Sequence, residues 1–187
     1  MTFPATPENR CVQTRRGFLA TLALGGLSLV RVPRPLRALE APRSLAFHHL
    51  HTGEDLAVEY FRLGDYQAPA LGEINRVLRD WRRNEIHPID PELLDLLHDL
   101  HAATGSARPF DVICGYRAPE TNAMLARQSS GVSPRSLHLV GKAIDIRLPD
   151  VPLPRLRDAA LGLRRGGVGY YPGSNFIHVD TGRVRSW

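Results

Sequence analysis

Two histidines and one aspartate in two short segments of the chain have the residue types of a metal site. His138 and Asp145 lie in the run Ser-Leu-His-Leu-Val-Gly-Lys-Ala-Ile-Asp, and His178 lies in the run Phe-Ile-His-Val-Asp. Two imidazole nitrogens and one carboxylate oxygen suit tetrahedral zinc, and three protein ligands leave the fourth position to water. Because zinc-bound water becomes a nucleophile near neutral pH, this set predicts hydrolytic chemistry.

The residues between the first two ligands predict how the backbone places them. Gly141 allows a turn between His138 and Asp145. The segment 142–148 then alternates as a half-buried strand does, with apolar side chains on one face and Asp145 on the other. We therefore expect the carboxylate to point away from the core side of this strand.

A second strand is predicted at residues 176–180. Its two-residue period puts His178 and Asp180 on one face, with Ile177 and Val179 on the opposite face. One strand can therefore carry both a metal ligand and a second acid.

Other interpretations of the same residues remain open. Of the 8 histidines in the chain, those outside the two segments have no such partners, and short motifs of common residues also arise by chance. Iron or cobalt would accept the same three ligands as zinc, so the residue types leave the metal open as well.

The motifs resemble those of a known enzyme family. The pattern Ser-x-His-x-x-Gly-x-Ala-x-Asp with a later strand histidine resembles the LAS zinc metallopeptidases, which include D-alanyl-D-alanine dipeptidases, D-alanyl-D-alanine carboxypeptidases and murein endopeptidases. From about Leu45 to Trp187 the chain is similar to the murein endopeptidase K group. The segments that carry this resemblance are His51–Glu54, Leu78–Arg82, Ile89–Pro91, Gly115–Pro119, Gly166–Tyr171 and His178–Gly182.

The resemblance implies roles for four residues. His138, Asp145 and His178 would hold one zinc ion, and Arg117 would be the cation near the scissile carbonyl. A guanidinium stays charged at any working pH and offers fixed donors to a developing oxyanion. Arg117 lies between a predicted strand and a predicted helix, where functional side chains often gather, although a surface arginine at a helix start is the alternative.

The chain departs from the wider family at the expected general base. Many of these enzymes have a glutamate three residues before the last ligand, but here that position is Asn175, which cannot take a proton. Asp180 is the nearest acid by sequence and could accept a proton from zinc-bound water. Its alternative role is to orient a ligand histidine or an arginine, and the sequence does not decide between the two.

Two further residues are candidates for contacts with substrate. Ser136 resembles the family's serine two residues before the first histidine, although a loop serine can instead bond its own backbone. Tyr116 could line a cleft for a peptide stem, as could Tyr170 and Tyr171. Aromatic residues near a sheet also serve packing alone.

The N-terminal residues 1–41 resemble a twin-arginine export signal. Arg15 and Arg16 precede a moderately apolar run from Phe18 to Val30, which is shorter than the ~20 residues of a membrane-spanning helix. A signal anchor is the competing interpretation. We expect cleavage near residues 38–41, export to the periplasm, and no stable membrane insertion afterwards.

Composition limits the function classes further. Lys and Arg total 24 against 19 Asp and Glu, but residues 1–41 hold six arginines and two glutamates, so the remainder is nearly neutral. Without a clustered basic run, nucleic-acid binding is not expected. Only Cys114 would survive cleavage, so no intrachain disulfide can form; we interpret this cysteine as a small buried apolar residue.

The remaining pattern predicts one α+β domain at residues 42–187, with an antiparallel central sheet that carries the zinc site and helices packed mainly from the N-terminal half. A hairpin is expected around residues 51–55. Strands are expected at 45–50, 56–63, 110–114, 142–148, 168–171 and 176–180, and helices at 70–83, 91–103, 120–128 and 153–163.

These observations predict a periplasmic zinc endopeptidase that acts on peptidoglycan peptides. A D,D-carboxypeptidase or dipeptidase acting on free stem peptides is the enzymatic alternative. A non-catalytic, zinc-containing wall-binding module is the alternative from another class, because the usual glutamate is missing.

Overall fold

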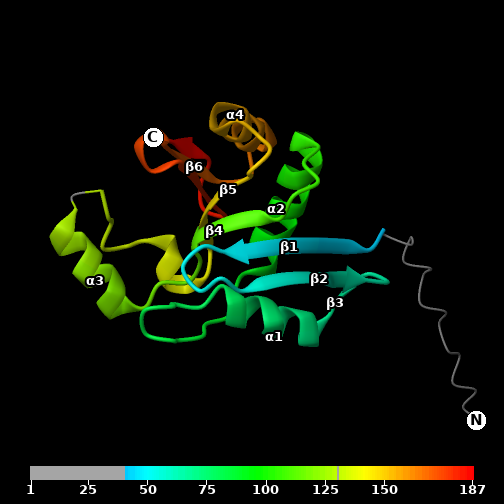
Figure 1. Cartoon of the computed structure of the whole chain (residues 1–187), viewed down its shortest axis with the longest axis horizontal. Helices are drawn as coiled ribbons and strands as arrows, with labels where there is room; N and C mark the ends of the chain where they lie inside the picture. Colours follow the sequence, from blue (N-terminus) through cyan, green and yellow to red (C-terminus); the bar gives the residue numbers. More distant parts are fainter. Residues whose placement is uncertain (1–40, 130) are drawn as a thin grey trace, which may run out of the picture. The chain divides into compact units, whose positions relative to one another are not determined.

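The computed structural model describes residues 41–129 and 131–187, all within one compact unit, Pro35–Trp187. The predicted export signal, apart from Ala41, lies outside the described residues. Three strands and two helices come first along the described chain, and strands and helices are interspersed after them (Figure 1). The strands are β1 (Arg43–His49), β2 (Asp55–Arg62), β3 (Asp65–Tyr66), β4 (Phe110–Cys114), β5 (Ala143–Arg147), β6 (Gly167–Tyr171), β7 (Phe176–Asp180) and β8 (Arg185–Ser186). The helices are α1 (Ala68–Val77), α2 (Pro91–Thr104), α3 (Pro119–Gln128) and α4 (Leu153–Leu163), with 3-10 turns η1 (Leu137–Val140) and η2 (Pro172–Ser174).

The described strands form one mixed sheet in the order β3-β2-β1-β4-β5-β7-β6-β8. The predicted α+β class is confirmed, but the prediction of an antiparallel sheet is wrong, because β1 pairs with β4 and β6 pairs with β8 in parallel. Between β1 and β4 the chain passes through β2, β3, α1 and α2, a connection long enough to return β4 in the direction of β1. The hairpin of β1 and β2 is antiparallel, as predicted.

Three neighbouring strands align the candidate site in one row across the sheet. In the antiparallel pairing of β5 with β7, Asp145 lies directly opposite His178. In the pairing of β4 with β5, Cys114 lies opposite Asp145, next to a register shift in β4. Directly opposed residues of neighbouring strands point to the same face. The sheet itself therefore brings these side chains together.

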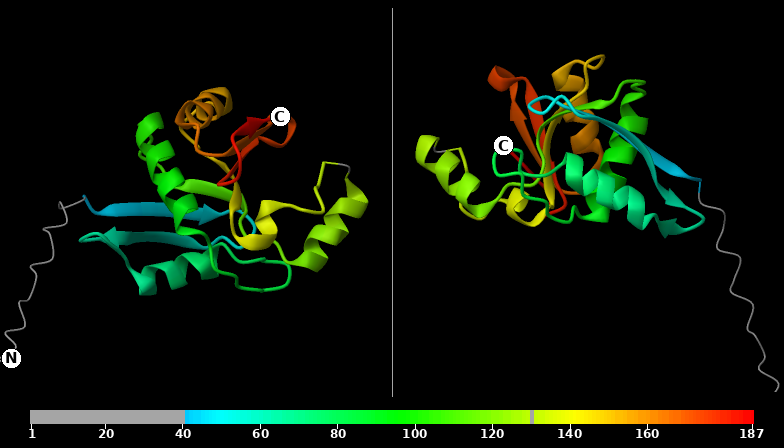
Figure 2. Two further views of the ribbon diagram at one scale, coloured as in Figure 1. Left: turned by 180° about the vertical axis from the view of Figure 1, so that it is seen from behind. Right: turned by 60° about the horizontal axis from the view of Figure 1, so that its bottom comes forward.

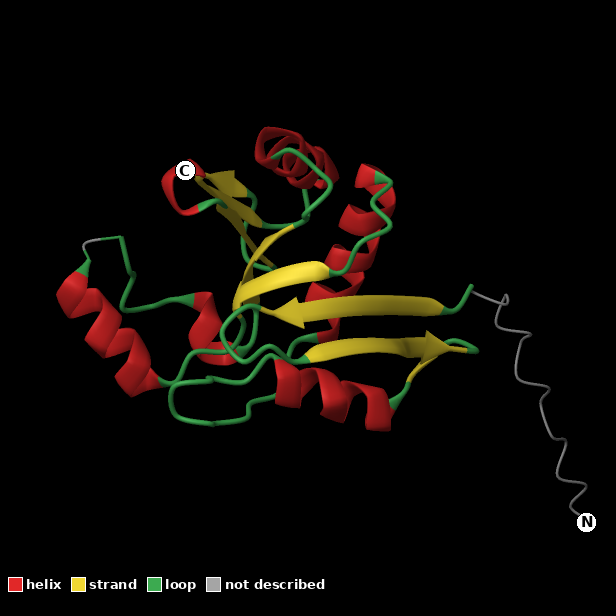
Figure 3. Cartoon of the chain, viewed as in Figure 1, coloured by secondary structure: helices red, strands yellow, loops and turns green. Residues whose placement is uncertain are grey.

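The other face of the same strands is the apolar core. Ile144 and Ile146 of β5 are fully buried with Ile177 of β7 in one hydrophobic cluster, to which Leu156 of α4 also belongs. Helix α4 contacts β6 and β7, and α2 contacts both α4 and β1. The helices flank the strands in Figure 3. Burial of this face fixes which side of β5 and β7 is left for polar side chains.

Among the described residues, α1 and α2 belong to the N-terminal half and α3 and α4 to the C-terminal half, so the helices do not come mainly from the N-terminal half as predicted. Helix α3, just after Arg117, extends away from α2 and α4 in Figure 1 and in both views of Figure 2. No helix among residues 41–129 and 131–187 has the length and apolar character that a membrane span requires.

The first helix is shorter than predicted, ending at Val77 instead of residue 83. The Leu78 carbonyl accepts the backbone N–H of Tyr116 from the segment after β4. Asp80 then accepts the backbone N–H groups of Arg82 and Arg83 in a turn. The apolar spacing in the sequence continues to Trp81, beyond the end of the helix. The hydrogen bond from Tyr116 to Leu78 and the turn at Asp80 replace the helical bonds there.

Candidate metal centre and active-site cleft

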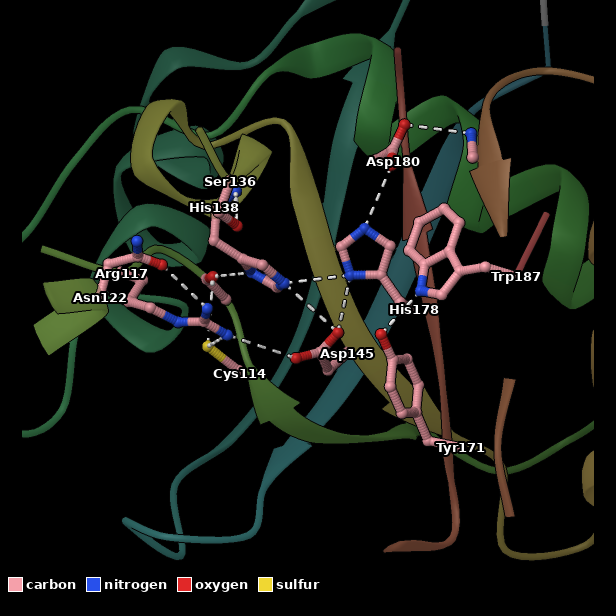
Figure 4. Close-up of polar contacts among 12 residues, drawn as sticks. Cys114, Arg117, Asn122, Ser136, His138, Asp145, Tyr171, His178, Asp180 and Trp187 are labelled. Atoms are coloured by element: carbon pink, nitrogen blue, oxygen red, sulfur yellow. Dashed lines mark hydrogen bonds and ion pairs between the residues drawn. The ribbon is translucent and has the colours of Figure 1, made fainter. Parts of the chain in front are cut away.

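One side-chain atom each from His138, Asp145 and His178 converge on one point beside β5 and β7. His138 Nε2 lies 3.1 Å from His178 Nδ1 and 3.3 Å from Asp145 Oδ1, and His178 Nδ1 lies 2.8 Å from Asp145 Oδ1. Figure 4 shows the three side chains pointing toward one another. Ligands about 2.0–2.1 Å from a tetrahedral zinc ion lie roughly 3.3 Å apart, so this triangle has the size of a zinc-binding face.

The groups behind each imidazole decide which nitrogen faces the triangle. His138 Nδ1 lies 2.7 Å from the carbonyl oxygen of Gly115, which can only accept, so Nδ1 carries the proton. His178 Nε2 donates in the same way to Asp180 Oδ2 at 3.1 Å. The neutral tautomers therefore aim two nitrogen lone pairs and one carboxylate oxygen at the same point, which is the donor set a cation requires.

Without a cation, the electrostatics of this set favour binding a proton instead. Burial disfavours the charged form of His138, but the negative charges of Asp145 and Cys114 outweigh burial and raise its pKa to about 10. Burial raises the pKa of Asp145, but the neighbouring His138 and His178 hold it well below its usual range. The same negative surroundings that stabilise a proton on His138 would stabilise a divalent cation bound between these three side chains.

The turn that carries His138 is built by its neighbours. Ser136 is the N-cap of η1, and its Oγ accepts the backbone N–H of His138 at 3.4 Å. Gly141 ends the turn in the left-handed region at φ 65°, as its predicted role requires, and a Cβ there would collide with the carbonyl oxygen of Pro88. The His138 carbonyl accepts the backbone N–H of Arg117, so the turn and the arginine are fixed to each other.

Arg117 is 8% exposed and its guanidinium points toward the candidate metal centre. Nη1 donates to Oδ1 of Asn122 at 3.1 Å, and Nη2 lies 3.5 Å from Cys114 Sγ and 3.7 Å from Asp145 Oδ2. Nε has no partner within the described structure. The two terminal nitrogens of the guanidinium are therefore held by protein groups, while Nε remains an unpaired donor.

Cys114 joins this cluster, contrary to the interpretation of a plain apolar residue. Ligand atoms of Cys114, His138 and Asp145 all lie within 4.8 Å of one another. Burial raises the pKa of the thiol, but the charges of His138 and Arg117 outweigh burial and lower it. The triangle containing His178 is tighter than the one containing Cys114, so the sulfur is better placed as a neighbour of Arg117.

Asp180 lies behind His178 and is fully buried, at 0% exposure. Oδ1 accepts from the backbone of Gly167 and Gly182 at 3.0 and 2.8 Å and from Arg185 Nη1 at 3.0 Å. Oδ2 accepts from Arg185 Nη2 at 2.6 Å and from His178 Nε2. Although burial raises its pKa, these donors, beginning with His178, hold the pKa of Asp180 well below its usual range.

A cleft of about 510 Å³ opens over the row. Ser129 and most of residues 131–138 line one part of the cleft, and the rings of Tyr171, Phe176 and Trp187 line another. Tyr171 and Phe176 stack at 4.7 Å between ring centroids. A polar wall with arginine and serine thus faces an aromatic wall across the candidate metal centre.

The structure places the predicted substrate residues differently. Ser136 lines the cleft, whereas Tyr116 is not among its lining residues. Tyr116 is 5% exposed, donates to Glu85 and stacks on His87 at 4.6 Å. The exposed Asn175 ends η2 in the left-handed region and is also outside the cleft lining.

Sequence reasoning missed four residues of the site: Cys114, Asn122, Arg185 and Trp187. In the sequence Asn122 is an ordinary polar residue of a predicted helix. In the structure it is buried, accepts from Arg117 and donates to the Ser133 carbonyl. Arg185 begins β8, a strand of two residues that is too short for any periodic signal, and Trp187 directly follows this strand. Only the glycines of 166–169 hinted that another segment approaches closely there.

Comparison with known proteins identifies the family of the chain. A family model described as Peptidoglycan L,D-endopeptidase MepK matches residues 37–187. The peptidoglycan L,D-endopeptidase MepK of Escherichia coli (strain K12) is 42% identical over 171 residues, covering 89% of this chain and 94% of that protein. A probable peptidoglycan L,D-endopeptidase MepK of Haemophilus influenzae is 43% identical over 172 residues, covering 89% and 92%. No solved structure was found to match the chain.

The family match spans every residue of the cleft, from Arg117 to Trp187. It agrees with the resemblance carried by the sequence motifs. The chain therefore belongs to the peptidoglycan L,D-endopeptidase MepK family.

Proposed function

We propose that the protein is a zinc-dependent endopeptidase that hydrolyses amide bonds in peptidoglycan cross-links. One observation carries the metal part: two histidine lone pairs and one carboxylate oxygen converge within 3.3 Å of each other, with both tautomers fixed from behind. The family membership carries the reaction and the substrate class. Because the relatives are named L,D-endopeptidases, we propose a cross-link between an L and a D centre as the bond that is cut.

His138, Asp145 and His178 would hold one zinc ion, through Nε2, Oδ1 and Nδ1. The ion would supply Lewis acidity and a water of lowered pKa. Arg117 would bind the oxyanion that develops on the scissile carbonyl, because its donors already converge beside Asp145. A fixed guanidinium needs no rearrangement when that charge appears.

We assign Asp180 the orienting role of the two that the sequence left open. Its oxygens are occupied by five donors, and it lies on the far side of the His178 ring from the triangle. A carboxylate so placed fixes the tautomer of a metal ligand. Among the residues that line the cleft, Asp145 is the only carboxylate.

For substrate contacts, we propose Ser136 on the polar wall and Tyr171 on the aromatic wall. Both line the cleft, whereas the hydroxyl of Tyr116 is committed to Glu85. A peptide stem has both amide groups and apolar carbon atoms, which suit the two walls. Tyr116 therefore has a packing role in this proposal.

Incubation of zinc-loaded protein with purified muropeptide dimers tests the function. Monomers released from L,D-cross-linked dimers support the proposal, shortened stems would indicate a carboxypeptidase, and unchanged dimers would indicate a binding module. His138→Ala should abolish turnover because one ligand is lost, while His98→Ala, a substitution in α2 outside the cleft lining, should retain it. Turnover that survives His138→Ala would contradict the metal assignment.

We also propose export to the periplasm by the twin-arginine route, where the wall substrate lies. Residues Arg15 and Arg16 motivate this, although they lie outside the described structure. Zinc binding contributes folding free energy, so a protein exported in folded form would carry its metal. Replacing both with lysine should lower the exported fraction, measured by immunoblot of cell fractions. The double change Arg34→Lys and Arg37→Lys is the matched control, and undiminished export with the first pair would exclude this route.

A further inference from the structure

The segment 185–187 lies against His178 from two directions, although no sequence motif pointed to it. The first contact runs through Asp180. Arg185 donates from Nη1 to Oδ1 at 3.0 Å and from Nη2 to Oδ2 at 2.6 Å, and Oδ2 also accepts from His178 Nε2 at 3.1 Å. A two-point fork fixes the plane of a carboxylate more tightly than a single donor can. The position of Arg185 is thereby transmitted to the imidazole.

The second contact is an aromatic one. The Trp187 indole lies 5.3 Å from the His178 ring between centroids. Its Nε1 donates to the Tyr171 hydroxyl at 2.7 Å, and the Arg185 guanidinium lies 4.8 Å from the indole ring. Its backbone bonds to Val168 and Tyr170 on β6. The indole is thus fixed at its edge, its face and its backbone.

Strand β6 has glycine at the two positions that face Arg185 and Trp187, Gly167 and Gly169. Gly169 lies opposite His178 in the β6–β7 pairing, and a Cβ on it would lie 2.8 Å from the indole. A Cβ on Gly167 would lie 2.5 Å from Asp180 Oδ2 and would also collide with Arg185 Nη1. Glycine inside a strand weakens it, so two in one short strand indicate a close approach. The segment 185–187 fills both positions.

From this arrangement we infer that Arg185 and Trp187 are positioning residues for His178. Arg185 keeps Asp180 in the plane that holds the proton on Nε2, and Trp187 limits rotation of the ring. Together they aim the Nδ1 lone pair at the triangle with His138 and Asp145. The inference rests on the proposed function, because it takes His178 as a zinc ligand.

Zinc affinity without substrate tests this role, since both residues also line the cleft and activity alone would not separate the two effects. Zinc dissociation constants are measured by competition with a chromophoric chelator. Arg185→Met should weaken binding by up to about 10-fold, the lower end of the range for removing a direct outer partner of a ligand, because Arg185 acts through Asp180. Arg183→Met, the same change at an exposed position two residues away, should stay within about twofold. Trp187→Leu should also weaken binding.

A double-variant comparison tests whether Arg185 acts through Asp180. Asp180→Asn alone should weaken zinc binding, and adding Arg185→Met to it should cause little further loss. Losses that multiply would show that Arg185 acts independently and would overturn this part. Arg185→Lys retains the charge without the fork and should fall between the wild type and Arg185→Met, which keeps the test valid if Arg185→Met does not fold. The cobalt-substituted spectrum of each variant should change where the ligand geometry changes.

The outcomes separate the inference from the function it rests on. If His178→Ala weakens zinc binding while Arg185→Met and Arg185→Lys both match the wild type, the positioning role is rejected and the proposed metal site stands. If His178→Ala binds zinc as the wild type does, the ligand assignment itself is rejected. Thermal midpoints of the metal-free proteins show whether a variant is folded before its affinity is interpreted.

Discussion

At the scale of single residues, the acceptors behind the imidazoles matter as much as the ligands. The Gly115 carbonyl, which follows β4, fixes the tautomer of His138, and the Asp180 carboxylate, two residues along β7, fixes that of His178. The residue types were readable from the sequence, but the atom that each histidine presents was not. Which nitrogen faces the ion follows from these outer contacts.

Arg117 gives the prediction at this scale. Arg117→Lys retains the charge but loses the fork that Asn122 and Cys114 hold, so a donor to the oxyanion is misplaced. We expect kcat to fall by roughly 10²–10³-fold, as for loss of one oxyanion donor, with zinc content unchanged.

The measurement is steady-state cleavage of muropeptide dimers together with metal analysis. Arg127→Lys, an exposed arginine at the end of α3, is the matched control and should cleave at the wild-type rate. An unchanged kcat for Arg117→Lys would remove this residue from oxyanion binding.

At the scale of elements, the site is one row of a sheet joined to one tight turn. The strands β4, β5 and β7 supply Cys114, Asp145 and His178 by register, whereas His138 arrives from η1 outside the sheet. The turn must therefore be held at a fixed distance from the strands. Gly141 supports this by packing its α-carbon against the Pro88 carbonyl.

Two glycine substitutions test the turn. Gly141→Ala places a Cβ in the left-handed region and against Pro88, so we expect the free energy of unfolding to fall by more than about 1–2 kcal/mol and zinc affinity to fall with it. Gly72→Ala in α1 meets no atom within 4 Å, and we expect it to be neutral or to stabilise by up to about 1 kcal/mol. Urea unfolding of both proteins measures the difference. Equal stabilities would show that the turn adjusts at no cost.

At the scale of the whole molecule, one buried histidine outside the site couples stability to pH. His49 is 0% exposed, and its Nδ1 accepts backbone N–H groups of His51 and Thr52 at 3.3 and 3.4 Å. Burial, reinforced by His51, lowers the pKa of His49 from 6.5 to about 4. The folded protein therefore keeps this imidazole neutral where an unfolded chain would protonate it.

The sign of the pH effect follows from proton binding. Between about pH 6.5 and 4 the unfolded state binds a proton at His49 that the folded state does not, so the free energy of unfolding falls as the pH falls. His49→Asn keeps an acceptor without a titrating ring and should reduce the slope in this window. Urea unfolding at several pH values from 7 to 4.5 measures both slopes, and groups common to both proteins cancel in the difference. Identical slopes would show that another group causes the effect.

The sequence by itself determined much of the local structure and the residue types of the site. The bounds of β4, β7 and α4 agree with the predicted 110–114, 176–180 and 153–163, because alternation and helical spacing are set by neighbours in the chain. Opposite faces for Asp145 and the isoleucines of β5 followed from the same alternation. The three proposed ligands were readable as types and spacing.

Tertiary structure alone decided the rest. The parallel pairings, the early end of α1, and the approach of Cys114, Asn122, Arg185 and Trp187 to the site all depend on contacts between distant segments. Pairing partners and hydrogen-bond acceptors leave no periodic trace in the chain, because each is chosen by the fold as a whole. Helical and strand periods are local, whereas the meeting of distant segments at the site is decided by the pairing of the whole sheet.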